Sequence, residues 1–124
     1  MFQKYFTPKE ATKRLPLVKK IVNDILTKAN RIRLIAKEYE TEQLPLEYSD
    51  LEGDISVHVH ELENLGCFYK DWNFEIGLVD FPAIIAGEEV FLCWRSDEEN
   101  LQWYHGVEEC FAGRRLIPPE LLSK

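Results

Sequence analysis

The side chains best suited to chemistry in this 124-residue chain are one carboxylate and several cations in its second half. Asp80 lies among apolar residues, so a strand there would hold a carboxylate in apolar surroundings, where it needs a partner. Arg95, Arg114 or Arg115 can provide a bidentate contact to it. His105 follows on a separate apolar segment, and the candidate site consists of Asp80, Arg95, His105 and Arg114. Two interpretations stay open. These four residues form either an anion-binding or acid–base site, or a structural ion pair that ties the C-terminal tail to a sheet.

A second pair of candidate ligands is His58 and Glu61, whose His-x-x-Glu spacing places two ligand types on one face of a helix. A complete metal site needs three or four ligands, and the acidic residues of the preceding helix lie outside its apolar stripe. We therefore predict no metal site and no cofactor, with His58 as a polar residue that fixes how two helices pair. The pair His58–Glu61 remains the weaker, metal-binding alternative.

The three cysteines, at positions 67, 93 and 110, form neither a disulfide framework nor a Cys-x-x-Cys metal motif. We interpret them as reduced thiols in a cytoplasmic protein. Cys93 lies in the apolar run 90–94, where a free cysteine usually behaves as a small hydrophobic residue.

Charge and motif content exclude several classes of function. The formal net charge is −7, but residues 1–40 hold ten Lys/Arg against four Asp/Glu, and residues 41–124 hold five against eighteen. The basic residues are spread around a predicted helix and form no tract, so we expect no nucleic-acid binding. No apolar run approaches the roughly 20 residues of a membrane span, and no phosphate-binding glycine motif or nucleophile elbow is present.

Two helices are predicted in the first half of the chain. Thr7, Pro8 and Glu10 start the first one with a capping box, while Pro16 should kink or restart it. Its apolar residues repeat at spacings of three and four, the pattern of a coiled-coil-like seam: Leu15, Val18, Val22, Ile25, Ala29, Ile32, Ala36 and Tyr39. The second helix ends at Gly66, and its seam positions are Leu51, Ile55, His58, Leu62 and Leu65.

The second half is predicted to form a small antiparallel sheet. Strands are expected over 67–70, 77–85, 89–95 and 101–105, with a hairpin turn over 86–88. Pro82 cannot donate to a ladder, so its strand should lie at an edge or a bulge there. Residues 111–119 are expected as a tail. The sequence thus predicts one α+β domain over 1–124, with a long-helix hairpin in 1–66 and a β-rich half in 67–124.

The first helical seam is longer than the second, so part of its apolar stripe lacks a partner within the hairpin. Further apolar residues widen this stripe beyond what two helices require. We expect a second subunit to cover the surplus, which makes the protein a homodimer whose interface includes Ile21, Ile25, Leu26, Ile32 and Ile35.

Several short motifs together resemble one bacterial family. They are, among others, Phe6-Thr7-Pro8-Lys9-Glu10-Ala11, Gly77-Leu78-Val79-Asp80-Phe81-Pro82-Ala83, Leu92-Cys93-Trp94-Arg95 and Trp103-Tyr104-His105. The family is catalogued as domain of unknown function 2203, and the resemblance covers nearly the whole chain. It implies a small, uncharacterised bacterial protein and carries over no reaction, cofactor or substrate.

Two hypotheses for function follow. The first is a non-enzymatic interaction or scaffold protein that acts as a homodimer through its first helix. The alternative is a small-molecule- or metal-binding enzyme with a site around Asp80, His105 and Arg114. A deep pocket lined by those three side chains would favour the enzyme, and a large exposed apolar stripe on the first helix would favour the scaffold.

Overall fold

The first helix, α1 (Pro8–Glu38), begins where the sequence predicts it. In the computed structural model, which describes residues 2–39, 43–109 and 111–122, the Thr7 hydroxyl accepts from the Glu10 N–H at 3.1 Å and the Glu10 carboxylate accepts from the Thr7 N–H at 3.0 Å. The helix continues through Pro16, so the predicted restart does not occur. Leu15 and Val18 are buried on either side of the proline, and their packing holds this turn despite the missing hydrogen bond.

The second helix, α2 (Leu46–Leu65), starts one turn earlier than its seam pattern indicates. Its first residue, Leu46, is 76% exposed, so this turn has no buried position from which the helix could have been recognised. The end of the helix is as predicted. Gly66 adopts a left-handed conformation (φ 98°), and its N–H donates to the carbonyls of Glu63 and Leu62.

Five antiparallel strands follow in the spatial order of the sequence: β1 (Phe68–Tyr69), β2 (Leu78–Ile85), β3 (Glu88–Arg95), β4 (Trp103–Gly106) and β5 (Arg115–Leu116). The prediction of an α+β fold is confirmed. The stretch expected as a tail supplies β5, a short 3-10 helix η1 (Phe111–Gly113) and a terminal turn of helix, α3 (Pro119–Leu122). The predicted thiol at Cys110 lies outside the described residues.

Pro82 lies in the part of β2 that has no neighbouring strand on one side. β1 pairs only with Val79 and Asp80, so the following residues of β2 have no strand on that side. There the Pro82 carbonyl accepts from the Phe6 N–H at 2.7 Å, and the N-terminal segment takes the place of a strand. The proline therefore lies on a locally open edge, as its missing donor predicts.

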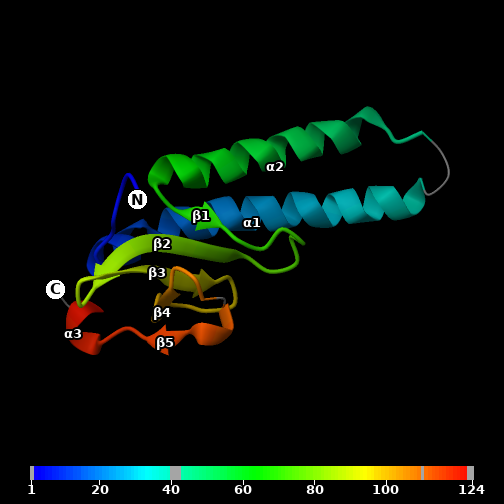
Figure 1. Ribbon diagram of the computed structural model, residues 1–124. Coiled ribbons are helices and arrows are strands. Elements are labelled where there is room, and N and C mark those ends of the chain that lie inside the picture. The colour runs from blue at the N-terminus through cyan, green and yellow to red at the C-terminus, as the bar shows by residue number, and fades with distance from the viewer. Residues whose placement is uncertain (1, 40–42, 110, 123–124) are drawn as a thin grey trace.

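The helical hairpin covers one face of the sheet (Figure 1). Side chains alternate along β2 and β3, and those on the helix-facing side join α1 in one core, which includes Val18, Val22, Ile25, Val79, Phe81, Leu92 and Trp94. The opposite face carries Asp80, Cys93 and His105. Among the described residues, no helix combines the length and apolar character needed to cross a membrane.

The five residues assigned to a dimer interface lie inside or at the margin of this core. Ile21, Ile25 and Ile35 are 5%, 0% and 1% exposed, and Leu26 and Ile32 are half-buried. The sheet and α2 cover the apolar stripe from Leu15 to Ala29, whereas towards the end of α1 Ile32 is half-buried and Ala36 is exposed. Ile21, Ile25 and Ile35 are buried within the chain and cannot contact a partner, so the homodimer stays a prediction.

The contact between β2 and α1 gives a stability prediction. A Cβ on Gly77 would lie 2.2 Å from Cγ1 of Val22, which is buried, so Gly77→Ala should lower the free energy of unfolding by about 1–3 kcal/mol. Gly53 lies in α2, and no atom is within 4 Å of the place that a methyl group would take there, so Gly53→Ala should raise it by about 0.5–1 kcal/mol. Urea unfolding followed by circular dichroism measures both. Equal stability of Gly77→Ala and the unchanged protein would contradict this packing.

Candidate functional site

Three ligand-type side chains meet on the sheet face that points away from the helices. Asp80, Cys93 and His105 come from β2, β3 and β4, one from each neighbouring strand. The register pairs Asp80 directly with Cys93, and it pairs His105 with Phe91, two residues before Cys93, so all three share one face. They are 4%, 2% and 4% exposed, and their oxygen, sulfur and nitrogen atoms lie within 4.8 Å of one another.

The ring of His105 is oriented by the backbone. Its Nδ1 lies 2.8 Å from the Gly106 carbonyl, which can only accept, so Nδ1 carries a hydrogen and donates. Nε2 then faces Asp80 Oδ1 at 3.3 Å. The hydrogen bond with Asp80, and after it that with Cys93, raises the pKa of His105 to about 10. The raised pKa favours the imidazolium, whose Nε2 hydrogen faces the carboxylate of Asp80 and the sulfur of Cys93.

A cavity of about 290 Å³ opens above this cluster. The three ligand-type side chains form its buried part, while Lys70 and Glu109 are exposed side chains of its lining. Apolar residues complete the lining: Leu78, Phe91 and Val107. The cluster is thus buried but reaches a space that a small molecule can fill.

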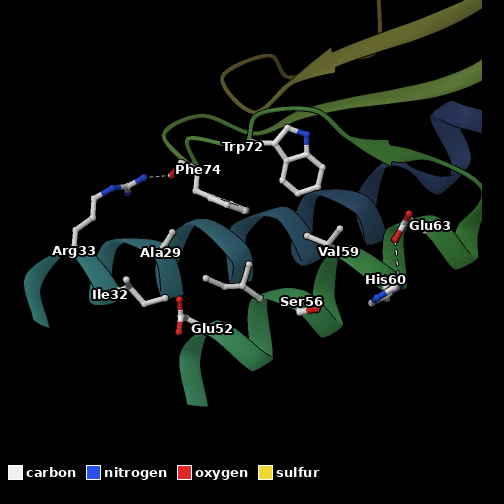
Figure 2. A pocket seen from close by; sticks show the side chains of 11 residues that line it. Ala29, Ile32, Arg33, Glu52, Ser56, Val59, His60, Glu63, Trp72 and Phe74 are labelled. Atoms are coloured by element: carbon white, nitrogen blue, oxygen red, sulfur yellow. Dashed lines mark hydrogen bonds and ion pairs between the residues drawn. The ribbon is translucent and has the colours of Figure 1, made fainter. Parts of the chain in front are cut away.

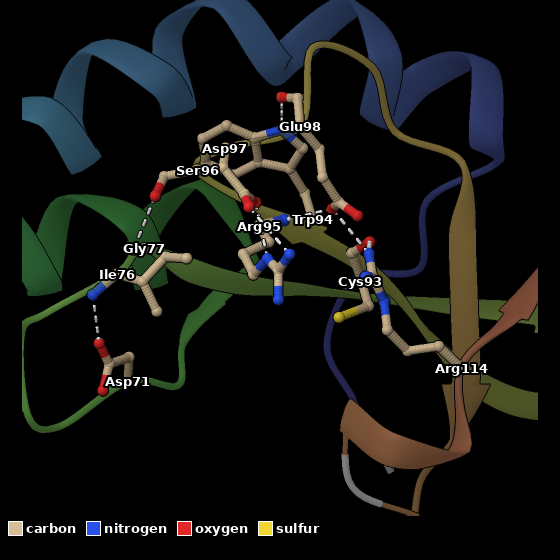
Figure 3. A network of polar contacts seen from close by, with 10 residues as sticks. All are labelled: Asp71, Ile76, Gly77, Cys93, Trp94, Arg95, Ser96, Asp97, Glu98 and Arg114. Carbon is tan, nitrogen blue, oxygen red and sulfur yellow. Dashed lines mark hydrogen bonds and ion pairs between the residues drawn. The ribbon is translucent and has the colours of Figure 1, made fainter.

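The two arginines of the predicted site are engaged elsewhere (Figure 3). Arg114 Nη2 donates to Glu98 Oε1 at 2.7 Å and to the Cys93 carbonyl at 3.1 Å. Arg95 binds Asp97 with two hydrogen bonds of 2.6 and 2.8 Å. The predicted four-residue site is therefore divided in two: the structure brings Asp80 and His105 together, and it places the arginines in a separate ion-pair network.

Cys93 was not predicted as a site residue, although the turn before its strand carries a signal for it. In the structure Ala86 and Gly87, with φ of 52° and 81°, make the turn between β2 and β3. A two-residue turn at these positions pairs Asp80 with Cys93. The three-residue turn that was predicted pairs Asp80 with Trp94 instead, and this shift of one residue moves Cys93 to the other face.

The alternative pair, His58 and Glu61, forms a surface contact. His58 Nδ1 lies 2.7 Å from Glu61 Oε1, and His58 Nε2 lies 2.7 Å from the Lys28 ammonium. Both ring nitrogens of His58 have a partner, and the Lys28 ammonium lies at Nε2, where a metal ion would bind. Among the described residues, three metal-ligand types converge only at Asp80, Cys93 and His105.

A larger cavity of about 550 Å³ lies between the two helices and the loop that follows β1 (Figure 2). Its lining is mainly apolar, and the loop contributes Trp72 and Phe74. Three of its polar side chains are engaged: Arg33 Nη2 donates to the Phe74 carbonyl at 2.7 Å, and His60 lies 3.3 Å from Glu63. The lining of this groove is mainly apolar, whereas the smaller cavity is lined by three side chains of metal-ligand type.

In the ion-pair network, the pair of Arg114 is more buried than the pair of Arg95, so we expect Arg114 to contribute more to stability. The side chains of Arg114 and Glu98 are 10% and 17% exposed, so Arg114→Met should lower the free energy of unfolding by about 1.5–3 kcal/mol, because a charged hydrogen-bond acceptor loses its partner. Arg95→Met, which breaks a more exposed pair, should change stability little. Thermal unfolding of both variants checks this. A larger loss for Arg95→Met would contradict the assignment.

Comparison with known proteins supports a family but no activity. A family model described as Uncharacterized conserved protein (DUF2203) matches residues 4–117. No curated protein and no solved structure matches the chain. The match spans more than half of the 124 residues and confirms the resemblance seen in the sequence motifs. The chain belongs to the DUF2203 family of uncharacterized conserved proteins.

Proposed function

We propose that the protein binds one divalent transition-metal ion through a carboxylate oxygen of Asp80, Sγ of Cys93 and Nε2 of His105. The observation that carries the proposal is the convergence of these atoms within 4.8 Å, with Nδ1 of His105 already bound to a backbone carbonyl. Metal-bound histidines typically donate their second ring N–H in this way, which fixes the tautomer and leaves the other nitrogen for the ion.

The donor set indicates the class of metal. One nitrogen, one sulfur and one oxygen suit Zn²⁺ and similar ions, whereas Mg²⁺ and Ca²⁺ prefer oxygen ligands alone. Bonds of about 2.0–2.3 Å hold the ligand atoms of a tetrahedral site roughly 3.3–3.7 Å apart. His105 Nε2 and Asp80 Oδ1 are already 3.3 Å apart. Binding of the metal would release the Nε2 proton of His105 and the thiol proton of Cys93.

Three protein ligands leave a fourth position, and the adjoining cavity of about 290 Å³ gives it room. Structural zinc sites are closed by four protein ligands, while catalytic ones keep such an open position. The proposal thus follows the alternative hypothesis, a metal-binding enzyme, with Cys93 in place of Arg114. A metal-binding thiolate must stay reduced, and Cys67 and Cys93 are both free thiols, so we also propose that the protein acts in the cytoplasm.

Cobalt substitution tests the metal site directly. Titration of the purified protein with Co²⁺ should produce a thiolate-to-cobalt charge-transfer band that saturates at one ion per chain, because Cys93 supplies a sulfur ligand. Cys93→Ser should abolish the band, and His105→Gln should weaken binding strongly.

Cys67→Ser is the matched control, since Cys67 is equally buried but its Sγ donates to the Leu62 carbonyl at 3.3 Å, away from the site. This variant should keep the band. Circular dichroism verifies that each variant is folded. A band that survives in folded Cys93→Ser, or no cobalt binding by the unchanged protein, would overturn the proposal.

A second candidate is the non-enzymatic interaction role as a homodimer. It is favoured by large apolar side chains that stay exposed on the helices and the loop after β1, namely Leu34, Leu46, Val57 and Trp72 at 59–76%. None of these four side chains belongs to the interface predicted from the sequence.

Sedimentation equilibrium tests this second candidate. We expect twice the 14.6 kDa chain mass, and Leu34→Glu should shift the equilibrium to the monomer. Leu116→Glu, on β5 at the far end of the sheet, is an equally exposed control and should not. A 14.6 kDa species for the unchanged protein at micromolar concentration would refute the homodimer.

A further inference from the structure

We propose that the cavity above the metal site binds a small organic monocarboxylate, with Lys70 as its cationic partner. This inference rests on the metal site proposed above. It names the class of ligand that would occupy the open position, from the charges and the apolar residues of the same cavity.

Lys70 is held at the cavity by two features. Its backbone N–H donates to the Leu78 carbonyl at 2.8 Å, which fixes the residue at the end of β1. Its ammonium lies 4.9 Å from the ring centroid of Phe91 and 5.8 Å from that of Phe68. These cation–π contacts orient the side chain across the face that also carries the metal ligands. Among the described residues, no carboxylate forms an ion pair with it.

The other charges of the cavity balance one another. Glu109 accepts from the Gly106 N–H at 2.6 Å and forms an ion pair with Arg115. A divalent ion would be neutralised by the carboxylate of Asp80 and the thiolate of Cys93. One positive charge, that of Lys70, is then left, and it matches a monoanion better than a dianion such as hydrogen phosphate.

The apolar residues of the cavity lining indicate the chemical nature of the rest of the ligand. Leu78, Phe91 and Val107 face the cavity together with the polar groups, and the volume of about 290 Å³ is at the lower end of the range for small-molecule sites. A short hydrocarbon chain can lie on these apolar side chains while its carboxylate reaches the metal and Lys70. A carboxylate with a short apolar chain therefore fits both the charge and the surface.

Butyrate added to the Co²⁺-loaded protein tests the inference. We expect saturable changes in the cobalt absorption bands, with weaker changes for inorganic phosphate. Lys70→Gln should weaken butyrate binding about tenfold, the value of one favourable charge contact, while Co²⁺ affinity stays the same. Lys70→Arg should restore most of it. Lys4→Gln is the matched control, because the Lys4 ammonium also lies over an aromatic ring, 4.8 Å from the centroid of Phe6, but outside this cavity.

The outcomes separate the two proposals. Co²⁺ binding without any response to butyrate, or equal butyrate affinity for Lys70→Gln and the unchanged protein, overturns the carboxylate site and leaves the metal site standing. Stronger binding of phosphate than of butyrate overturns the choice of a monoanion. Failure of the unchanged protein to bind Co²⁺ overturns both.

Discussion

The pairing of β2 with β3 is the constraint on which the rest of the structure depends. Ala86 and Gly87 both have positive φ angles, and a turn of two such residues matches the twist of a hairpin. It sets a ladder of eight residue pairs, from Leu78 with Arg95 to Ile85 with Glu88. Since side chains alternate along a strand, this one turn decides which residues face the helices and which face outwards.

Because of this alternation, the two faces of the sheet carry different kinds of side chain. Val79, Phe81 and Leu92 are fully buried against α1, and Gly77 lets the helix approach so closely that Val22 occupies the space of a side chain there. The outer face of the sheet does not pack against α1. It holds the buried polar cluster, flanked by Phe91, which is 5% exposed. Most of the buried apolar side chains thus lie on one side of the sheet, while the other side carries the polar cluster.

Features that depend on short sequence signals were predictable, whereas features that depend on contacts between distant residues were not. The capping box at Thr7 and Glu10 and the glycine at position 66 are local signals, and both helix ends were identified from them. Asp80 and His105 were selected because polar side chains in apolar segments need partners. Arg114 was assigned to the wrong carboxylate, because its partner Glu98 is 16 residues away and is fixed by a tertiary contact. Cys93 was missed through an error of one residue in the turn.

The polar cluster is the basis for the proposal of a metal site. A buried ion pair is often no more stabilising than apolar residues of the same size, since burial removes the hydration of both charges. The role expected of such a pair, to tie the C-terminal segment to the sheet, is performed by Arg114, which joins Glu98 and the carbonyl of Cys93. Asp80 and His105 are therefore not needed for that purpose. Asp80, Cys93 and His105 converge beneath an open cavity, and in the proposed site a divalent ion would take the place of the positive charge that the raised pKa of His105 now keeps beside Asp80.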